Sequence, residues 1–207
     1  TPVQDLVDTL SQRWPMKVLR VSEEAKGMDT VLDLTSFFLE AGLDRSSLVL
    51  AIGGGITTDI AGFAAAIYMR GIKCAYVPTT FLAQVDAAIG GKTGVNFAGC
   101  KNILGVIREP EFTFISSEVL DTLPRRDFLS GAAELLKTFI IEDGGNYQRA
   151  IMTLQKIASQ EGKISSPELK QSLTELIAEA AKVKADIVSR DLYESGERRV
   201  LNLGHTF

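Results

Sequence analysis

The sequence predicts an α/β fold in its first part and a helical fold in its second part. Short apolar runs of strand length alternate with helical patterns up to about residue 125, and this alternation is typical of parallel βαβ units. From Pro124 onward the apolar residues recur at helical spacing, and no convincing strand follows. We therefore expect two domains, residues 1–125 and residues 126–207.

The α/β part is expected to alternate strands and helices. The expected strands are residues 16–22, 47–52, 73–78 and 112–116. The expected helices are residues 30–42, 57–71 and 79–91, and the polar, glycine-rich stretch 92–102 is predicted to be a loop.

Three helices are expected in the second part, at residues 126–141, 146–160 and 166–191. The last of these has the clearest start signal, with Ser166 as N-cap and Pro167 in the first helical position. Its apolar residues, among them Leu169, Leu173 and Leu176, form one stripe at helical spacing.

Composition excludes several classes of function. The chain of 207 residues has a net charge of −4, so it lacks the basic footprint of a nucleic-acid-binding protein. Cys74 and Cys100 form no CxxC pair, which fits a reducing cytosol. The polar, amphipathic start of the chain is unlike a signal peptide, and the apolar run 61–69 is too short to span a bilayer.

Two strand ends carry residues suited to a nucleotide. Gly53–Gly55 follow the expected strand 47–52, and Asp59 lies four residues further on. Glycines let the backbone approach a pyrophosphate, a helix N-terminus attracts it, and Asp59 suits a ribose hydroxyl. Position 58, where the dinucleotide fingerprint has glycine, is threonine. The alternative is a tight turn capped by Thr57 or Thr58, and residues 78–80 repeat the same layout.

The stretch "DAAIGGKT" resembles a nucleotide phosphate loop only in part. Residues 91–93 match the end of that motif, but Asp86 stands where its first glycine belongs, and a carboxylate repels phosphate. We reject the phosphate-loop interpretation. Asp86 and Lys92, followed by Lys101 and Asn102, suit a small polyhydroxy anion. The alternative is a surface loop.

The helical part offers fewer signals. Glu134 and Lys137 have the i, i+3 spacing of a surface ion pair, but their neighbours are strongly apolar. Lys182 and Lys184 are predicted to be solvated. The single histidine is His205. A histidine without a second one nearby is more often a structural residue than a metal ligand.

Six segments occur in an order that resembles the 3-dehydroquinate synthase family. They are "GGGITTDIAGF", "YMRG", "PTTFLAQVDAAIGGKTGVN", "KNILG", "LPRRDFLSGAAELLK" and "VKADIVSRDLYESGERRVLNLGHTF". The resemblance covers residues 23–207. It implies a Rossmann-like NAD-binding α/β domain, a helical domain, an active site between them, and a cytoplasmic homodimer without nucleic-acid or membrane partners.

The resemblance also implies a reaction. The family converts 3-deoxy-D-arabino-heptulosonate 7-phosphate to 3-dehydroquinate and phosphate in the shikimate pathway, which leads to aromatic amino acids. A substrate hydroxyl is oxidised transiently by NAD, phosphate is eliminated, the ketone is reduced, and an intramolecular aldol step closes the ring. A divalent metal, zinc and alternatively cobalt, would lower the pKa of the hydroxyl that is oxidised.

The family's motifs assign roles to individual residues. The expected NAD contacts are Gly53, Gly54, Gly55, Asp59, Thr79, Thr80, Lys101 and Thr122, with Glu23 and Lys26 from a less well matched segment in which Ser22 replaces a glycine. The expected substrate contacts are Asp86, Lys92, Asn102, Lys137, Lys184, Arg198 and Asn202. Arg70 is expected to reach the substrate phosphate across the dimer. Glu134 and His205 are expected to be two of three zinc ligands.

The third zinc ligand and the remainder of the helical domain follow "GHT" in the family, and this chain has no second histidine. We therefore expect an internal portion of the enzyme, a truncated helical domain, poor zinc binding and little activity for the chain alone. Three alternatives stay open: a sister sugar-phosphate cyclase, a metal-dependent polyol dehydrogenase that would release NADH, and a non-catalytic fragment.

Overall fold

The computed structural model describes residues 1–159, 164 and 166–204. The chain divides into two compact units. Unit 1 comprises Thr1–Thr79 and Gly91–Ile115, and unit 2 comprises Thr80–Gly90 and Ser116–Phe207. The short segment Thr80–Gly90 thus belongs with the helical unit. The domain boundary expected at residue 125 stays a prediction.

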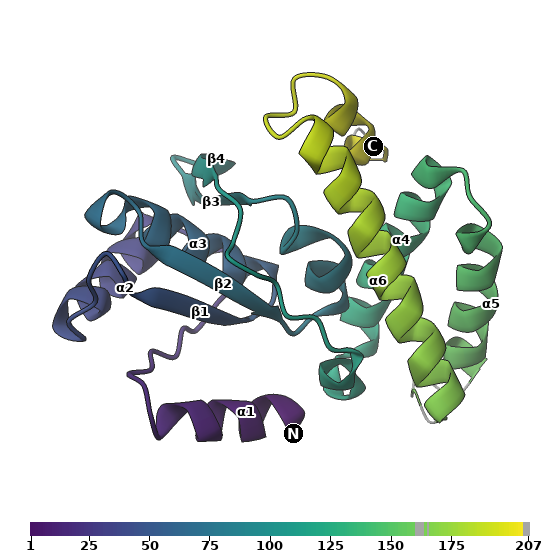
Figure 1. Ribbon diagram of the computed structural model, residues 1–207, viewed down its shortest axis with the longest axis horizontal. Coiled ribbons are helices and arrows are strands. Elements are labelled where there is room, and N and C mark those ends of the chain that lie inside the picture. The colour runs from purple at the N-terminus through teal and green to yellow at the C-terminus, as the bar shows by residue number, and fades with distance from the viewer. Residues whose placement is uncertain (160–163, 165, 205–207) are drawn as a thin grey trace. The chain divides into compact units, whose positions relative to one another are not determined.

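Unit 1 is built around a parallel βαβ arrangement (Figure 1). Strands β1 (Leu48–Gly53) and β2 (Lys73–Pro78) pair in parallel, and helix α3 (Gly55–Ile67) connects them and packs against both. Helix α2 (Met28–Glu40) packs on α3. Because α3 contacts the sheet, α2 and the following hairpin, its apolar residues are buried around most of its circumference.

An antiparallel hairpin completes unit 1, where the sequence predicted a loop. Strands β3 (Lys92–Phe97) and β4 (Cys100–Ile107) pair from Lys92↔Ile107 to Phe97↔Cys100. Gly94 and Gly105 face each other across the ladder, and a Cβ on Gly94 would lie 2.7 Å from the carbonyl oxygen of Leu104. These glycines permit the close pairing, but they also hide the apolar alternation by which a strand is recognised.

Two expected strands of unit 1 were not found as predicted. Residues 16–22 form no strand, and Val18 in this stretch is 79% exposed. The apolar alternation in the sequence therefore does not reflect packing against a sheet. Of the expected strand 112–116, Thr113 makes one isolated parallel bridge, to Tyr76. At the N-terminus, the amphipathic stretch forms helix α1 (Pro2–Ser11), which has no buried residues.

The remaining connections of the α/β part are short helices. The expected helix 57–71 is divided, because α3 ends at Ile67 and the 3-10 helix η1 (Tyr68–Arg70) follows, with Met69 and Arg70 at positive φ. The expected helix at 79–91 contains the single π-helical turn η2 (Ala83–Ala87).

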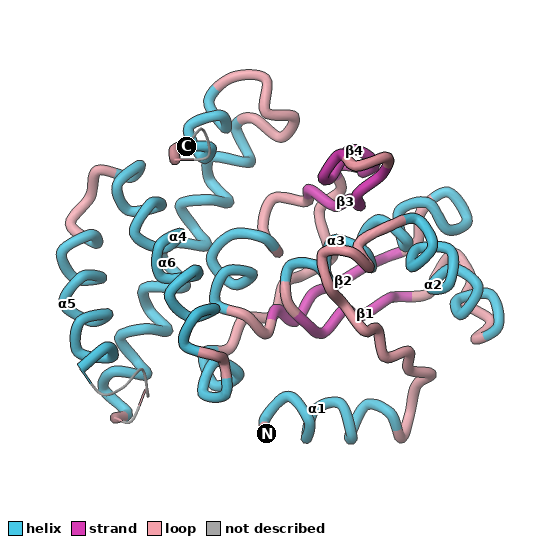
Figure 2. The backbone as a smooth tube through the Cα atoms, turned by 180° about the vertical axis from the view of Figure 1, so that it is seen from behind, coloured by secondary structure: helices cyan, strands magenta, loops and turns pink. Residues whose placement is uncertain are grey.

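Unit 2 is helical, as predicted. Helices α4 (Arg125–Glu142), α5 (Asn146–Ser159) and α6 (Pro167–Arg190) pack pairwise on one another (Figure 2). Ser166 caps α6, since its Oγ accepts the Leu169 amide at 3.2 Å. The 3-10 helices η3 (Ser117–Thr122) and η4 (Glu197–Asn202) flank the bundle in sequence. The predicted fold class, α/β followed by helical, is confirmed.

No helix among residues 1–159 and 166–204 has the length and apolar character needed to cross a bilayer.

Candidate functional site

The glycine loop of unit 1 joins β1 directly to α3. Gly53 ends the strand, Gly54 is the N-cap, and the helix begins at Gly55. The alternative of a turn capped by Thr57 or Thr58 is not found, because the N-cap is Gly54 and Thr58 Oγ1 donates to the Gly55 carbonyl at 3.0 Å. A Cβ on Gly53 would collide with the side chain of Thr57. The loop therefore presents backbone N–H groups at a helix N-terminus, as a pyrophosphate site requires.

Thr79 and Thr80 follow β2 as Gly54 and Gly55 follow β1. The Thr79 amide donates to the Gly53 carbonyl at 2.9 Å, which places the carboxyl ends of the two strands side by side in unit 1. In unit 2, the Thr80 hydroxyl accepts the Ala83 amide at 3.2 Å and caps the next helical turn. Neighbouring strand ends are where open parallel sheets bind ligands.

A buried lysine connects the glycine-loop helix to the hairpin. Lys26 is 5% exposed. Its Nζ donates to Asp59 Oδ2 at 2.5 Å and to Asn102 Oδ1 at 2.6 Å. Asn102, expected among the substrate residues, is thus held beside two expected NAD contacts. Two acceptors, one of them ionised, compensate the burial of the ammonium group.

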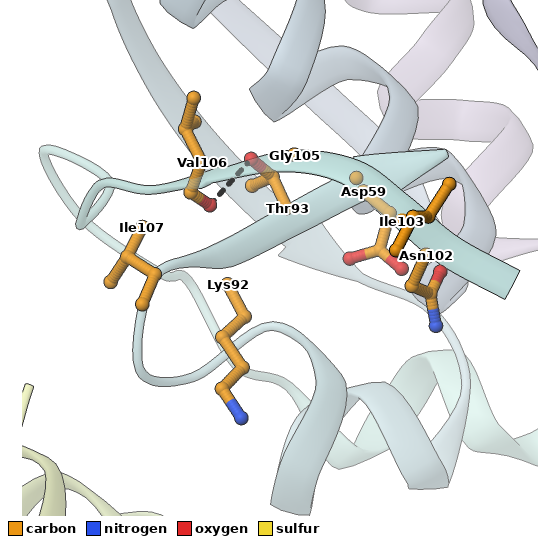
Figure 3. A pocket seen from close by; sticks show the side chains of 9 residues that line it. Asp59, Lys92, Thr93, Asn102, Ile103, Gly105, Val106 and Ile107 are labelled. Atoms are coloured by element: carbon orange, nitrogen blue, oxygen red, sulfur yellow. Dashed lines mark hydrogen bonds between the residues drawn. The ribbon is translucent and has the colours of Figure 1, made fainter. Parts of the chain in front are cut away.

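A cavity of about 480 Å³ opens beside this cluster (Figure 3). Its lining comes from α3 through Asp59 and from the hairpin through residues of β3 and β4. Lys92 lies at one end of the hairpin and Asn102 near the other, and Thr93 donates to the Val106 carbonyl at 3.3 Å between them. This volume is in the range of small-molecule sites.

The segment around Glu23 lies against the same hairpin. Lys101 Nζ is 3.3 Å from Glu23 Oε1, and both side chains are well exposed. Asn96, which the sequence analysis did not single out, donates to Glu23 Oε1 at 3.0 Å and accepts the Asn102 amide at 2.9 Å. The only sequence signal for Asn96 was an asparagine inside a polar, glycine-rich stretch.

In unit 2, Asp86 and Lys184 form a close ion pair. Lys184 Nζ donates to Asp86 Oδ1 at 2.5 Å and to the Asp86 carbonyl at 2.6 Å. The Lys184 side chain is 9% exposed, so the expectation that this lysine is solvated is wrong. Burial lowers the pKa of Lys184, opposed by Asp86, and the positive charges of Arg198 and Lys137 lower it further.

Glu134 and Lys137 also form an ion pair in unit 2, but it does not lie on the surface. Their side chains are 21% and 12% exposed, and Lys137 Nζ donates to the Leu201 carbonyl at 2.8 Å. The surface interpretation of this pair is therefore wrong. The apolar residues that surround the pair on α4 are the reason for its burial.

Glu134 has the chemistry of a metal ligand, since carboxylate oxygens bind zinc. Its position on α4, largely buried and one helical turn from Lys137, fits a carboxylate that faces a polar site. Among residues 1–159 and 166–204, no three His, Cys, Asp or Glu side chains gather as a metal site would need. His205, the other expected ligand, lies outside the described residues.

Arg198 is the largest fully buried side chain of unit 2. It is 2% exposed, and its guanidinium donates to the carbonyls of Leu192 at 2.7 Å and Gly90 at 2.8 Å. Asp191, which the sequence analysis missed, organises the preceding loop. Its Oδ2 accepts the amides of Gly196 at 2.8 Å and Arg198 at 3.0 Å.

Three further expected residues lie elsewhere. Asn202 donates to Glu194 Oε1 at 2.6 Å in the last described segment of unit 2. Thr122 is exposed at the end of η3, also in unit 2. Arg70 is exposed in unit 1, with φ of 69°. The structure thus brings many of the expected residues together within each unit, whereas Arg70 and Thr122 lie apart from them.

Comparison with known proteins places this arrangement in one family. The family model described as 3-dehydroquinate synthase N-terminal matches residues 16–130, and the model described as 3-dehydroquinate synthase C-terminal matches residues 131–207. Together they account for the chain from Met16 to its last residue.

Curated relatives carry the same name. The 3-dehydroquinate synthase of Pyrococcus abyssi is 44% identical over 189 residues, which are 91% of this chain and 53% of the relative. That of Koribacter versatilis is 45% identical over 184 residues, which are 89% of this chain and 48% of the relative. The chain therefore spans about half the length of the curated relatives it matches.

Solved structures share the fold. The 2-epi-5-epi-valiolone synthase of Streptomyces hygroscopicus, solved with NAD+ and Zn2+, is 31% identical with a TM-score of 0.79, over 92% of this chain and 51% of that one. A 2-deoxy-scyllo-inosose synthase, solved with carbaglucose-6-phosphate, NAD+ and Co2+, is 29% identical with the same score of 0.79, over 99% and 55%. An NADH-dependent butanol dehydrogenase of Thermotoga maritima, 17% identical with a TM-score of 0.62 over 96% and 60%, shares the fold alone. From the two family models and these relatives, the chain belongs to the 3-dehydroquinate synthase family.

Proposed function

We propose that this chain is the NAD-binding part and a portion of the helical part of a 3-dehydroquinate synthase. The enzyme would convert 3-deoxy-D-arabino-heptulosonate 7-phosphate to 3-dehydroquinate and phosphate. The observation that carries the proposal is a group of three cations in unit 2. Lys137, Lys184 and Arg198 are each nearly buried, and the charges of the other two lower the pKa of Lys184. Asp86 pairs with Lys184 and Glu134 with Lys137, and three cations gathered this closely suit an anionic ligand in addition to these carboxylates.

The substrate carries anions that suit this group. It carries a phosphate and a carboxylate, and lysine and arginine bind such groups through charge-assisted hydrogen bonds. Asp86 would accept a hydrogen bond from a substrate hydroxyl. Asp86 and Lys184 carry opposite charges 2.5 Å apart, so this pair could hold a proton or release one to the substrate. We include Lys92, Asn102 and Asn202 among the substrate contacts, and Arg70 as a contact to the substrate phosphate across a homodimer.

NAD would bind to unit 1 at the carboxyl ends of β1 and β2. The strand-to-helix glycines and the 13-residue helix α3 fit a pyrophosphate, and Asp59 fits a ribose hydroxyl. The contacts we propose are Gly53, Gly54, Gly55, Asp59, Thr79, Thr80, Lys101, Thr122, Glu23 and Lys26. When bound, NAD supplies the reversible oxidation of a substrate hydroxyl; the side chains of this chain bind, orient and exchange protons with the substrate.

A divalent metal, zinc or cobalt, would be held by Glu134 and His205 with a ligand from outside this chain's sequence. When bound, the metal stabilises the deprotonated form of a substrate hydroxyl. Glu134 would have to exchange its ion pair with Lys137 for the metal, which would free the ammonium of Lys137 for the substrate. We further propose a cytoplasmic homodimer.

Phosphate release tests the proposal. The assay supplies the heptulosonate phosphate with NAD and zinc, and it is run on the chain of 207 residues and on a longer chain of full family length. We expect 3-dehydroquinate and phosphate from the longer chain and little of either from the shorter one. Cyclisation of a sugar phosphate other than the heptulosonate would instead favour a sister cyclase, which the neighbours at 29–31% identity make the second candidate.

A further inference from the structure

Asn96 touches three of the residues proposed to bind NAD and substrate, without belonging to either set. It lies on β3 beside the register shift between Val95 and Phe97. Its side-chain nitrogen donates to Glu23 at Oε1 (3.0 Å) and at the carbonyl (3.2 Å). Its side-chain oxygen accepts the amide of Asn102 at 2.9 Å.

The backbone of Asn96 makes a further connection to the same segment. Its amide donates to the Lys26 carbonyl at 2.8 Å, and Gly27 and Asn96 form an isolated parallel bridge. Lys26 in turn donates to Asp59 and to Asn102. One asparagine thus joins the segment that contains Glu23 and Lys26 to the hairpin that contains Asn102.

Asn102 has an unusual backbone conformation where it contacts Asn96. Its φ is +53°, in the left-handed region that non-glycine residues occupy only when their surroundings favour it. In this conformation the amide of Asn102, near the start of β4, donates to Asn96. The side chain of the same residue accepts a hydrogen bond from Lys26.

We propose that Asn96 is a positioning residue of the NAD site: it holds Glu23, Lys26 and Asn102 in the arrangement that binds NAD and makes no contact with NAD itself. This inference rests on the proposed function, which identifies NAD as the ligand. The contacts of Asn96 among these residues stand independently of that function, so the two can be tested apart.

The first experiment measures NAD affinity by calorimetry for the wild-type chain and for Asn96→Ala. Loss of the three side-chain hydrogen bonds, each with a modest net contribution, should weaken NAD binding roughly tenfold. The matched control is Asn146→Ala, which removes an exposed amide that donates to Glu142 at 3.3 Å in unit 2. This control should bind NAD as the wild type does.

A second variant separates positioning from a general loss of stability. Asn96→Asp keeps an oxygen for the Asn102 amide but places a second carboxylate against Glu23, whose pKa is lowered in the wild type chiefly by the hydrogen bond from Asn96. Two adjacent carboxylates repel unless one is protonated. NAD affinity of Asn96→Asp should therefore rise as the pH falls from about 7 to about 5, while the wild type changes little over that range.

Amide hydrogen exchange of the free chain tests the arrangement without NAD. Protection of the Asn102 amide should fall at least tenfold in Asn96→Ala and stay unchanged in Asn146→Ala. If Asn96→Ala loses the protection of the Asn102 amide but the wild type does not bind NAD, the proposed function is wrong, while the contact between Asn96 and Asn102 is confirmed. If Asn102 protection or NAD affinity is the same in Asn96→Ala as in the wild type, the positioning role is overturned.

Discussion

Lys184 Nζ lies 2.5 Å from Oδ1 of Asp86 and 2.6 Å from the Asp86 carbonyl oxygen, although 98 residues separate the two in sequence. Asp86 is at the single π-helical turn and Lys184 is on α6, and both belong to unit 2. Their pairing gives the buried ammonium a counter-charge. It also fixes the short segment Thr80–Gly90 to the helices of unit 2.

Removing the negative charge of this pair should destabilise the chain more than removing the positive one. Asp86→Asn leaves Lys184 buried beside Arg198 and Lys137, and we expect a loss of about 1–3 kcal/mol in the free energy of unfolding, because Asp86 is partly exposed. Lys184→Met replaces the charge by an apolar chain and should cost less. Urea unfolding measures both, with Lys182→Met, at an exposed position of the same helix, as control.

The Asp86→Asn variant should also become more stable as the pH rises toward the ordinary pKa of lysine, about 10.4. The folded chain lowers the pKa of Lys184, so in this window the unfolded chain binds more protons, and stability increases with pH. Two results would contradict this interpretation of the pair. One is a stability difference between wild type and Asp86→Asn that stays constant with pH, and the other is a larger loss of stability in Lys184→Met than in Asp86→Asn.

Asp191 should contribute stability that disappears in acid. The amides of Gly196, Ser195 and Arg198 donate to its carboxylate and lower its pKa to about 2. Its contribution is therefore complete above the ordinary aspartate pKa of about 3.9 and is lost as the pH falls toward 2. In Asp191→Ala the acid-dependent difference should be absent. Urea unfolding across this pH range measures the difference, with Asp186→Ala as the control. Identical dependence of stability on acid pH in wild type and Asp191→Ala would refute the prediction.

Gly131 lies where α4 packs closely on residues 81 and 82. A Cβ there would lie 2.6 Å from the backbone nitrogen of Leu82 and would collide with the side chain of Phe81. We expect Gly131→Ala to cost about 1–3 kcal/mol, because overpacking outweighs the gain in helix propensity. Gly145→Ala, with no atom within 4 Å of the added Cβ, is the control and should be nearly neutral. Equal thermal midpoints for the two variants would mean that Gly131 does not pack as described.

The N-cap of α6 should account for a measurable part of the stability of unit 2. Ser166→Ala removes the acceptor of the Leu169 amide, and we expect a cost of about 1 kcal/mol. Ser189→Ala, which removes an exposed hydroxyl near the other end of the helix, is the matched control. A smaller loss for Ser166→Ala than for Ser189→Ala in urea unfolding would be inconsistent with the capping role.

The elements that sequence reasoning predicted well are those determined by nearby residues. Ser166 and Pro167 mark the start of α6, and the stripe through Leu173 and Leu176 predicts its buried face. Strand β2 was predicted at its observed bounds because its apolar run ends at Pro78. In each case the signal lies within a few residues of the element itself.

The elements that were missed depend on distant partners. The hairpin β3–β4 pairs through Gly94 and Gly105, which leave no apolar alternation to detect. Residues 16–22 show the alternation but have no sheet to join. The burial of Lys184 follows from Asp86, far away in sequence, so no local pattern on α6 could reveal it.

The candidate site divides in the same way. Gly53–Gly55 and Asp59 were proposed as a nucleotide site from local spacing, because the residues that such a site needs would lie within one turn; the strand-to-helix turn itself is confirmed. Asn96 and Asp191 were missed, because they hold other residues in place through hydrogen bonds that only the folded chain forms. The proposed substrate contacts came from the family resemblance, because composition and spacing left them unresolved, and they remain a prediction.

The stoichiometry of phosphate and NADH distinguishes the proposed cyclisation from net oxidation of the substrate. With a chain of full family length, NAD, zinc and 3-deoxy-D-arabino-heptulosonate 7-phosphate, we expect one phosphate and one 3-dehydroquinate per substrate consumed, with no accumulation of NADH. Lys184→Met should abolish this release. Net accumulation of NADH without phosphate release would contradict the account and would identify a polyol dehydrogenase instead.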